Sequence, residues 1–147
     1  MDTITITADD GADIDVLVWR PQGGGVRPIK GLVQLCHGMA EYAARYDEVA
    51  RFLADDGWLV VANDHRGHGP RAAAMRELGT TPDRGYHQLL DDLSAVADHF
   101  LAEVEGKPWF LVGHSMGSFL ARVLAARRGR EMAGLVAIGT GSSLGPL

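Results

Sequence analysis

The chain has 147 residues, a length that suits one domain with a buried hydrophobic core. Its composition, 46% hydrophobic and 22% charged residues, is typical of a globular protein. The formal net charge of −5, from 14 Lys and Arg against 19 Asp and Glu, disfavours nucleic acid as a partner, because proteins that bind it usually present a basic surface.

Three further features bear on the compartment. Cys36 is the single cysteine, which excludes an internal disulfide and fits a reducing environment. The first residues, MDTITITADD, lack the basic and apolar segments of a signal peptide. No apolar run approaches the length of a membrane span. We therefore expect a soluble, cytoplasmic protein without a membrane span.

The first predicted elements are two strands. Thr3–Ala8 alternates Thr and Ile, and Asp13–Trp19 alternates polar and apolar residues. Asp10 and Gly11 lie between them and favour a tight turn. The pattern predicts an antiparallel hairpin with one buried face. The glycine-rich stretch 21–28 predicts a turn rather than a domain linker, because it is short and lies between strands.

Four continuously apolar runs follow, and helical patterns separate them. Such runs are typical of parallel strands that are buried on both faces. They are Gly31–Cys36, Trp58–Ala62, Trp109–Val112 and Gly134–Ile138. Strands that alternate with helices imply a mostly parallel, doubly wound sheet, so we predict an α/β fold with an N-terminal antiparallel hairpin.

Three helices are predicted between these strands. The first ends at Gly57, and the third, Ser118–Arg128, closes with two arginines before Gly129. The apolar positions that define the helices are Tyr46, Val49, Ala50 and Leu53; Leu89, Leu93, Val96, Phe100 and Val104; and Phe119, Val123 and Ala126. Four acids of the second helix are expected on the surface, namely Asp91, Asp92, Asp98 and Glu103.

A Gly-x-Ser-x-Gly pentapeptide occurs twice, and its surroundings distinguish the two copies. Gly113–Gly117 follows a strand pattern and opens a helix pattern, so Ser115 is predicted on a sharp turn with its hydroxyl exposed and a helix N-terminus directed at it. Gly141–Gly145, which contains Ser143, has only two residues after it. We therefore predict that Ser115 is a nucleophile and that Ser143 is not.

A second constellation lies where a buried strand ends in His37, Gly38 and Met39. A backbone N–H just past a strand end can donate to a carbonyl oxygen that gains negative charge. Together with the N–H of Met116, the residue after the nucleophile, it would form a two-donor oxyanion hole. The alternative is an ordinary strand-to-helix turn with Gly38 as its hinge. The spacing alone leaves both interpretations open.

The segment Asn63–Gly69 contains two histidines and an aspartate. A metal site there would need further ligands from elsewhere in the chain. We therefore interpret the segment as a strand-end turn that Asp64 and Arg66 tie together. The sequence predicts neither a metal nor a cofactor.

Residues 37–69 and 112–125 together resemble the α/β-hydrolase superfamily, in particular its monoacylglycerol lipase/lysophospholipase-like branch, which is also described as serine aminopeptidase S33-like. That branch has a His-Gly-x-x-Glu oxyanion turn, an Asp-x-Arg-Gly-x-Gly turn and a Gly-His-Ser-Met-Gly elbow, and all three occur here in that order. The resemblance implies that Ser115 is the nucleophile and that the backbone N–H groups of Met39 and Met116 form the oxyanion hole. In the family pattern neither His37 nor His114 is the catalytic base.

The substrate is also a matter of resemblance. It implies a small-molecule ester of a lipid-like or otherwise apolar acyl group, and peptidase and acyltransferase activities stay open. A serine hydroxyl needs a base that a carboxylate holds, in the chain order Ser, acid, His in this superfamily. After Ser115 the sequence has one acid, Glu131, in a predicted helix-to-strand loop, and no histidine.

We therefore expect residues 1–147 to be the N-terminal portion of one α/β-hydrolase domain, with a sheet that is incomplete on its C-terminal side. A C-terminal part that holds the cap and the last strands, or a second chain, would supply the acid and the histidine. The alternatives are a short chain that takes its base from a partner subunit, and a non-catalytic scaffold that binds a ligand or partner on its exposed last strand. Residues 1–147 alone are expected to be inactive or nearly so.

Overall fold

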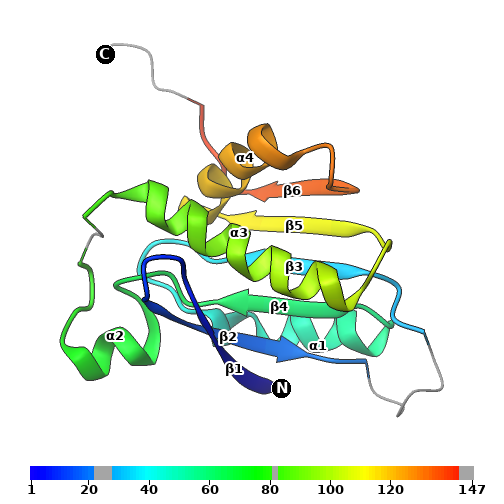
Figure 1. Ribbon diagram of the computed structural model, residues 1–147, viewed down its shortest axis with the longest axis horizontal. Helices are drawn as coiled ribbons and strands as arrows, with labels where there is room; N and C mark the ends of the chain where they lie inside the picture. Colours follow the sequence, from blue (N-terminus) through cyan, green and yellow to red (C-terminus); the bar gives the residue numbers. More distant parts are fainter. Residues whose placement is uncertain (22–27, 81–82, 143–147) are drawn as a thin grey trace.

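The computed structural model describes residues 1–21, 28–80 and 83–142, and its strands form one mixed sheet (Figure 1). The strands are β1 (Asp2–Thr7), β2 (Asp13–Trp19), β3 (Leu32–Cys36), β4 (Leu59–Asn63), β5 (Trp109–His114) and β6 (Gly134–Ile138). Their order across the sheet is β1-β2-β4-β3-β5-β6. β1 and β2 form the predicted antiparallel hairpin, and β2 pairs antiparallel with β4. β4, β3, β5 and β6 run parallel, as their apolar sequences predict.

Helices connect the parallel strands. They are η1 (Ala43–Tyr46), α1 (Asp47–Asp55), α2 (Gly69–Met75), α3 (Tyr86–Glu103) and α4 (Met116–Arg128). Gly57 follows α1 with a φ of 102°, the left-handed conformation that favours glycine there. The sequence does not predict α2, because its only apolar run is three successive alanines without helical periodicity. Most of the predicted turn at 21–28 lies outside the described residues.

The sheet is covered on both faces, with α3 and α4 on one side and α1 on the other (Figure 1). Successive residues of β3 alternate between the two cores. Leu32 and Cys36 belong to the core with α3 and α4, whereas Val33 and Leu35 pack with α1. The predicted face of α3 is buried at all five positions, which are Leu89, Leu93, Val96, Phe100 and Val104. This two-sided burial makes the central strands a rigid base for the loops at their carboxyl ends.

Two predictions of surface position are wrong. Asp92 was expected on the surface of its helix but is only 1% exposed, because its carboxylate binds Arg66 from the turn after β4. Val49 was expected on the buried face of α1 but is exposed. The helix buries Ala50 and Ala54 instead, and these small side chains let it approach the sheet closely.

β6 forms one edge of the described sheet. Within the residues that the structure describes, it pairs with β5 only, and the side chains of Leu135, Val136 and Ile138 are exposed. The apolar face predicted for α4 is wrong as well: Phe119 and Val123 are exposed, because the helix buries Leu120, Ala121 and Leu124 on its opposite face. The sheet therefore has the open, apolar edge that the sequence predicts. Of the helices described, none is both long enough and apolar enough to cross a membrane.

Candidate active site

Ser115 lies on the sharp turn between β5 and α4, with φ 50° and ψ −120°. Non-glycine residues rarely adopt such a conformation, which costs about 1–3 kcal/mol and persists only where the surroundings impose it. The flanking glycines show what imposes it. A Cβ atom at Gly113 would collide with the carbonyl oxygen of Gly117, and one at Gly117 would collide with the carbonyl oxygens of Cys36 and His37. The pentapeptide therefore packs α4 directly against the end of β3.

Hydrogen bonds fix the backbone of Ser115 from both sides. Its N–H donates to the carbonyl oxygen of Ile138 at the end of β6, with an N–O distance of 2.9 Å. Its carbonyl oxygen accepts from the N–H of Ser118 at 2.9 Å and from the hydroxyl of Ser118 at 2.6 Å. The Ser115 side chain is only half-buried. It is thus held in place and open to solvent, as a nucleophile requires.

The turn after β3 approaches Ser115 closely. A Cβ atom at Gly38 would lie 3.1 Å from the Cβ of Ser115. Residues 38–41 form a tight turn, in which Ala40 has a φ of 57° and the N–H of Glu41 donates to the carbonyl oxygen of Gly38. In the described parts of the chain, neither the N–H of Met39 nor that of Met116 has a hydrogen-bond acceptor. Both predicted oxyanion donors are therefore available to a ligand.

Glu41 connects this turn to its surroundings, and the sequence did not mark it as a functional residue beyond its place in the His-Gly-x-x-Glu motif. Its Oε2 accepts hydrogen bonds from the N–H of Gly38, the hydroxyl of Tyr46 and Nδ1 of His114, at 2.9, 2.7 and 3.2 Å. Burial disfavours its ionised form, but these hydrogen bonds outweigh burial and lower the pKa of the carboxyl group to about 2. Glu41 is therefore ionised at neutral pH.

Three imidazoles pack against one another where the turns after β3 and β4 meet. They belong to His37, His65 and His68. The Nδ1 of His37 donates to the carbonyl oxygen of Gly38 at 2.7 Å, so its Nε2 can accept the N–H of His65 at 3.0 Å. Burial lowers the pKa of His37 and, together with the neighbouring imidazoles, lowers that of His65 further. Both rings are therefore neutral, and they join the turns after β3 and β4.

A catalytic base for Ser115 is not found in the described residues. Both nitrogens of His37 are engaged. His114 binds Glu41 through Nδ1, but no hydrogen bond joins the Ser115 hydroxyl to His114 or to any other imidazole of the described residues. Glu131, the one acid after Ser115, pairs with Arg128 near the far end of α4, about 20 Å along the helix from Ser115. Ser143 lies outside the described residues.

An open groove of about 900 Å³ begins beside the elbow. Its walls come from the turns after β3 and β4, from α2 and from the start of α3. Apolar side chains dominate the lining, and they include Met39, Tyr42, Pro70, Leu78, Leu89 and Met116. Because Met39 and Met116 also carry the two free N–H groups, an apolar ligand in the groove would lie next to them.

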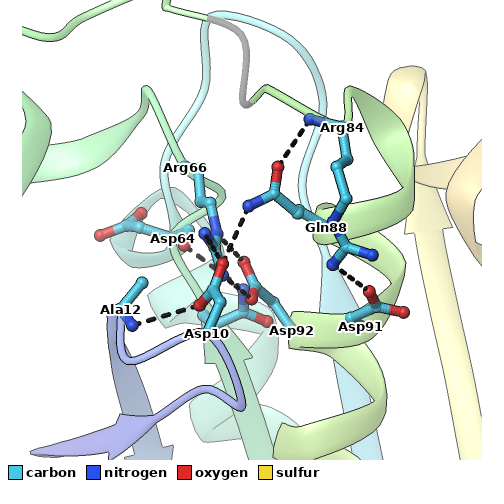
Figure 2. Close-up of polar contacts among 9 residues, drawn as sticks. Asp10, Ala12, Asp64, Arg66, Arg84, Gln88, Asp91 and Asp92 are labelled. Atoms are coloured by element: carbon cyan, nitrogen blue, oxygen red, sulfur yellow. Dashed lines mark hydrogen bonds and ion pairs between the residues drawn. The ribbon is translucent and has the colours of Figure 1, made fainter.

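Arg66 fastens one wall of this groove (Figure 2). Its guanidinium binds the buried carboxylate of Asp92 on α3 at 2.7 and 2.8 Å, and Asp10 in the hairpin turn at 2.6 and 3.0 Å. Asp64 accepts the N–H of Ala43 at 2.6 Å. Asp64 and Arg66 were predicted to tie this turn together, but their side chains bind distant segments instead and so hold the turn after β4 against them. No group of three or more His, Cys, Asp or Glu residues in the described chain is arranged to hold a metal ion.

Comparison with known proteins identifies the family of the chain. A family model described as "Serine aminopeptidase, S33" matches residues 27–146. The chain belongs to this family of α/β-hydrolases. It is 34% identical over 129 residues to human monoglyceride lipase, with 88% of this chain and 40% of that protein covered. It is 32% identical over 122 residues to a monoacylglycerol lipase of Mycolicibacterium smegmatis, again with 40% of the relative covered.

Solved structures of an esterase and of a lipase superimpose on the chain. A thermostable carboxyl esterase from Bacillus coagulans matches with a TM-score of 0.86 and 30% identity over 96% of this chain and 44% of the other. A soluble variant of monoglyceride lipase from Saccharomyces cerevisiae matches with a TM-score of 0.72 and 26% identity, covering 92% of this chain and 43% of the other. The chain therefore spans less than half the length of these relatives.

Proposed function

We propose that this chain carries the nucleophile and the oxyanion hole of a serine hydrolase that cleaves carboxylic esters. The observation that carries the proposal is the strained backbone of Ser115, next to two N–H groups that have no acceptor in the described residues, that of Met116 and that of Met39 in the turn that approaches Ser115. Donors placed where negative charge develops are usually the largest single contribution to acyl-transfer catalysis.

In the proposed reaction, Ser115 Oγ attacks the ester carbonyl as a base takes the hydroxyl proton. The N–H groups of Met39 and Met116 donate to the oxyanion of the tetrahedral intermediate. The carbon–oxygen bond of the ester then breaks, the leaving alcohol receives the proton from the base, and an acyl-enzyme remains. Water hydrolyses the acyl-enzyme by the same steps in reverse order. The acid and the histidine of the triad come from residues outside 1–147, either in the remainder of the same domain or in a second chain.

Two observations support an apolar acyl substrate. The groove beside Ser115 is lined mainly by apolar side chains, and several relatives are described as monoglyceride or monoacylglycerol lipases. A lipid-like ester therefore fits better than a peptide, although the family description refers to an aminopeptidase. The second candidate is a non-catalytic scaffold of the same fold, which the exposed apolar edge at β6 favours.

Labelling with a fluorophosphonate probe tests the nucleophile. In the hydrolase that contains this chain, we expect the probe to label Ser115, and Ser115→Ala to abolish both labelling and ester hydrolysis. Ser143→Ala is the matched control, since it removes the serine of the other Gly-x-Ser-x-Gly copy. Equal labelling of Ser115→Ala, or loss of labelling in Ser143→Ala, would overturn the assignment. A wild-type protein that is not labelled would favour the scaffold.

A further inference from the structure

We propose that Glu41 is a positioning residue for the oxyanion hole: its carboxylate ties the turn that carries the Met39 N–H to the strand end that carries Ser115. The inference rests on the proposed function, because it concerns how the two donors are held at their distance from the nucleophile. Glu41 itself has no part in bond making or breaking.

The geometry centres on one oxygen atom. Oε2 of Glu41 accepts hydrogen bonds from three chain segments: the turn after β3 through Gly38, η1 through Tyr46 and the end of β5 through His114. His114 directly precedes Ser115, and Gly38 directly precedes Met39. Two of the three ties, those to Gly38 and His114, therefore end one residue away from a group that the proposed reaction uses.

A carboxylate suits this position for a physical reason. Three donors converge on one atom, and only an ionised carboxylate offers an acceptor that also carries the compensating negative charge. The side chain of Glu41 is 15% exposed, so water cannot easily replace it as the common acceptor. Arg45 lies near the other oxygen, Oε1, at 3.5 Å and is largely exposed. The bonds at Oε2 are therefore the ones that hold the site.

The same bonds explain which N–H of the turn stays free. Gly38 gives its N–H to Glu41, and Glu41 gives its own N–H back to the carbonyl oxygen of Gly38. This reciprocal pair closes the turn around Met39 and Ala40, whose φ of 57° would otherwise be unfavourable. The N–H groups of Met39 and Ala40 are left over, and that of Met39 follows Gly38, which closely approaches Ser115. Without the Glu41 side chain, the N–H of Gly38 would be a competing donor and the turn would keep only the backbone bond of this pair.

The test compares Glu41→Ala, Glu41→Gln and a matched control in the hydrolase that contains this chain and its catalytic base. Removing one oxyanion donor costs about 10²–10³ in kcat, and a displaced donor should cost less, so we expect Glu41→Ala to lower kcat by roughly 10–100-fold with KM changed less than about threefold. Gln keeps one acceptor oxygen, so Glu41→Gln should recover part of kcat. Glu48→Ala removes an exposed carboxylate from α1 and should leave kcat unchanged.

A second readout separates positioning from folding. An aryl boronic acid forms a tetrahedral adduct on the serine whose oxygen occupies the oxyanion hole, so its Ki should rise in parallel with the loss of kcat. If Glu41→Ala does not fold, Glu41→Gln and Tyr46→Phe, which removes one of the three donors, should still show a lower kcat and a higher Ki.

The proposal is wrong if Glu41→Gln and Tyr46→Phe, or a folded Glu41→Ala, keep wild-type kcat and Ki, or if their losses appear only in KM or thermal stability. Failure of the proposed function would look different, because Ser115→Ala would then retain hydrolysis. Loss of activity in Ser115→Ala together with wild-type kinetics in the Glu41 variants would overturn the inference about Glu41 alone.

Discussion

Breaking the ion pair between Arg66 and Asp92 should destabilise the fold far more than breaking a neighbouring pair on the surface. Asp92 is 1% exposed, and all its charge compensation in the described structure comes from two hydrogen bonds of Arg66 (Figure 2). Arg66→Ala leaves that carboxylate buried and unpaired, which typically costs about 3–5 kcal/mol. The pair with Asp10 is more exposed and adds at most about 1 kcal/mol. The sum is a large share of a domain stability of roughly 5–15 kcal/mol.

The matched control is Arg84→Ala, which breaks the pair with Asp91, the exposed residue next to Asp92 on α3 (Figure 2). Both of those side chains are more than half exposed, so the loss should stay below about 1 kcal/mol. Urea unfolding followed by tryptophan fluorescence measures both variants, because Trp19 and Trp109 are fully buried.

The sign of a pH effect gives an independent check. In the wild type, burial raises the pKa of Asp92 even though Arg66 opposes it. Without Arg66 the raised pKa should rise further, so the penalty of Arg66→Ala should shrink as the pH falls and Asp92 becomes protonated. The double variant Arg66→Met/Asp92→Leu should recover most of the loss, since no charge is then buried. Equal costs for Arg66→Ala and Arg84→Ala, or a penalty that grows toward low pH, would refute the reasoning.

Two further predictions concern the histidine cluster and the sheet edge. Burial lowers the pKa of His37 and His65, so their contribution to stability is fully present above about pH 6.5 and is lost as the pH falls below it. The midpoint of urea unfolding should therefore fall toward pH 5, and the control His99→Gln, which replaces an exposed histidine, should show the same fall. A midpoint that does not change with pH would contradict the prediction. Residues 1–147 expressed alone should self-associate through the exposed apolar side chains of β6. They should also hydrolyse p-nitrophenyl acetate little above the rate in buffer, because no imidazole of the described residues is hydrogen-bonded to Ser115. Light scattering should show less association for Val136→Lys, and a soluble monomer with Ser115-dependent turnover would mean that the chain contains a base.

The strands and the buried face of α3 were predictable because they depend on periodicity. Continuous apolar runs predict strands buried on both faces, and the five apolar positions of α3 follow one helical stripe. The hairpin pattern likewise predicts β1 and β2. In each case the spacing of apolar residues in the sequence is also the spacing that places their side chains on one buried face.

Contacts between distant segments were not predictable in this way. In the sequence, Asp92 looks like any surface acid on a helix. Its carboxylate can be buried only because the fold brings Arg66, which lies 26 residues earlier in the chain, into contact with it. Glu41 shows its spacing from Gly38 in the sequence, but its bonds to Tyr46 and His114 require the fold. Val49 was assigned to the wrong face because helical spacing fits it as well as Ala54, and only the sheet decides between them.

The site depends on close approach of backbones more than on side chains. Gly117 places the start of α4 against the carbonyl oxygens that end β3, where any Cβ would collide, and Gly38 brings the next turn to within van der Waals distance of Ser115. The two free N–H groups, from Met39 and Met116, lie in these two backbones, so their spacing is set by the packing of β3 against α4. The methionine side chains are then free to line the groove, where their chemistry affects the fit of the acyl group and not the stabilisation of the oxyanion. Replacing either Met with Leu should therefore change KM, whereas kcat should depend on the glycines and on Glu41.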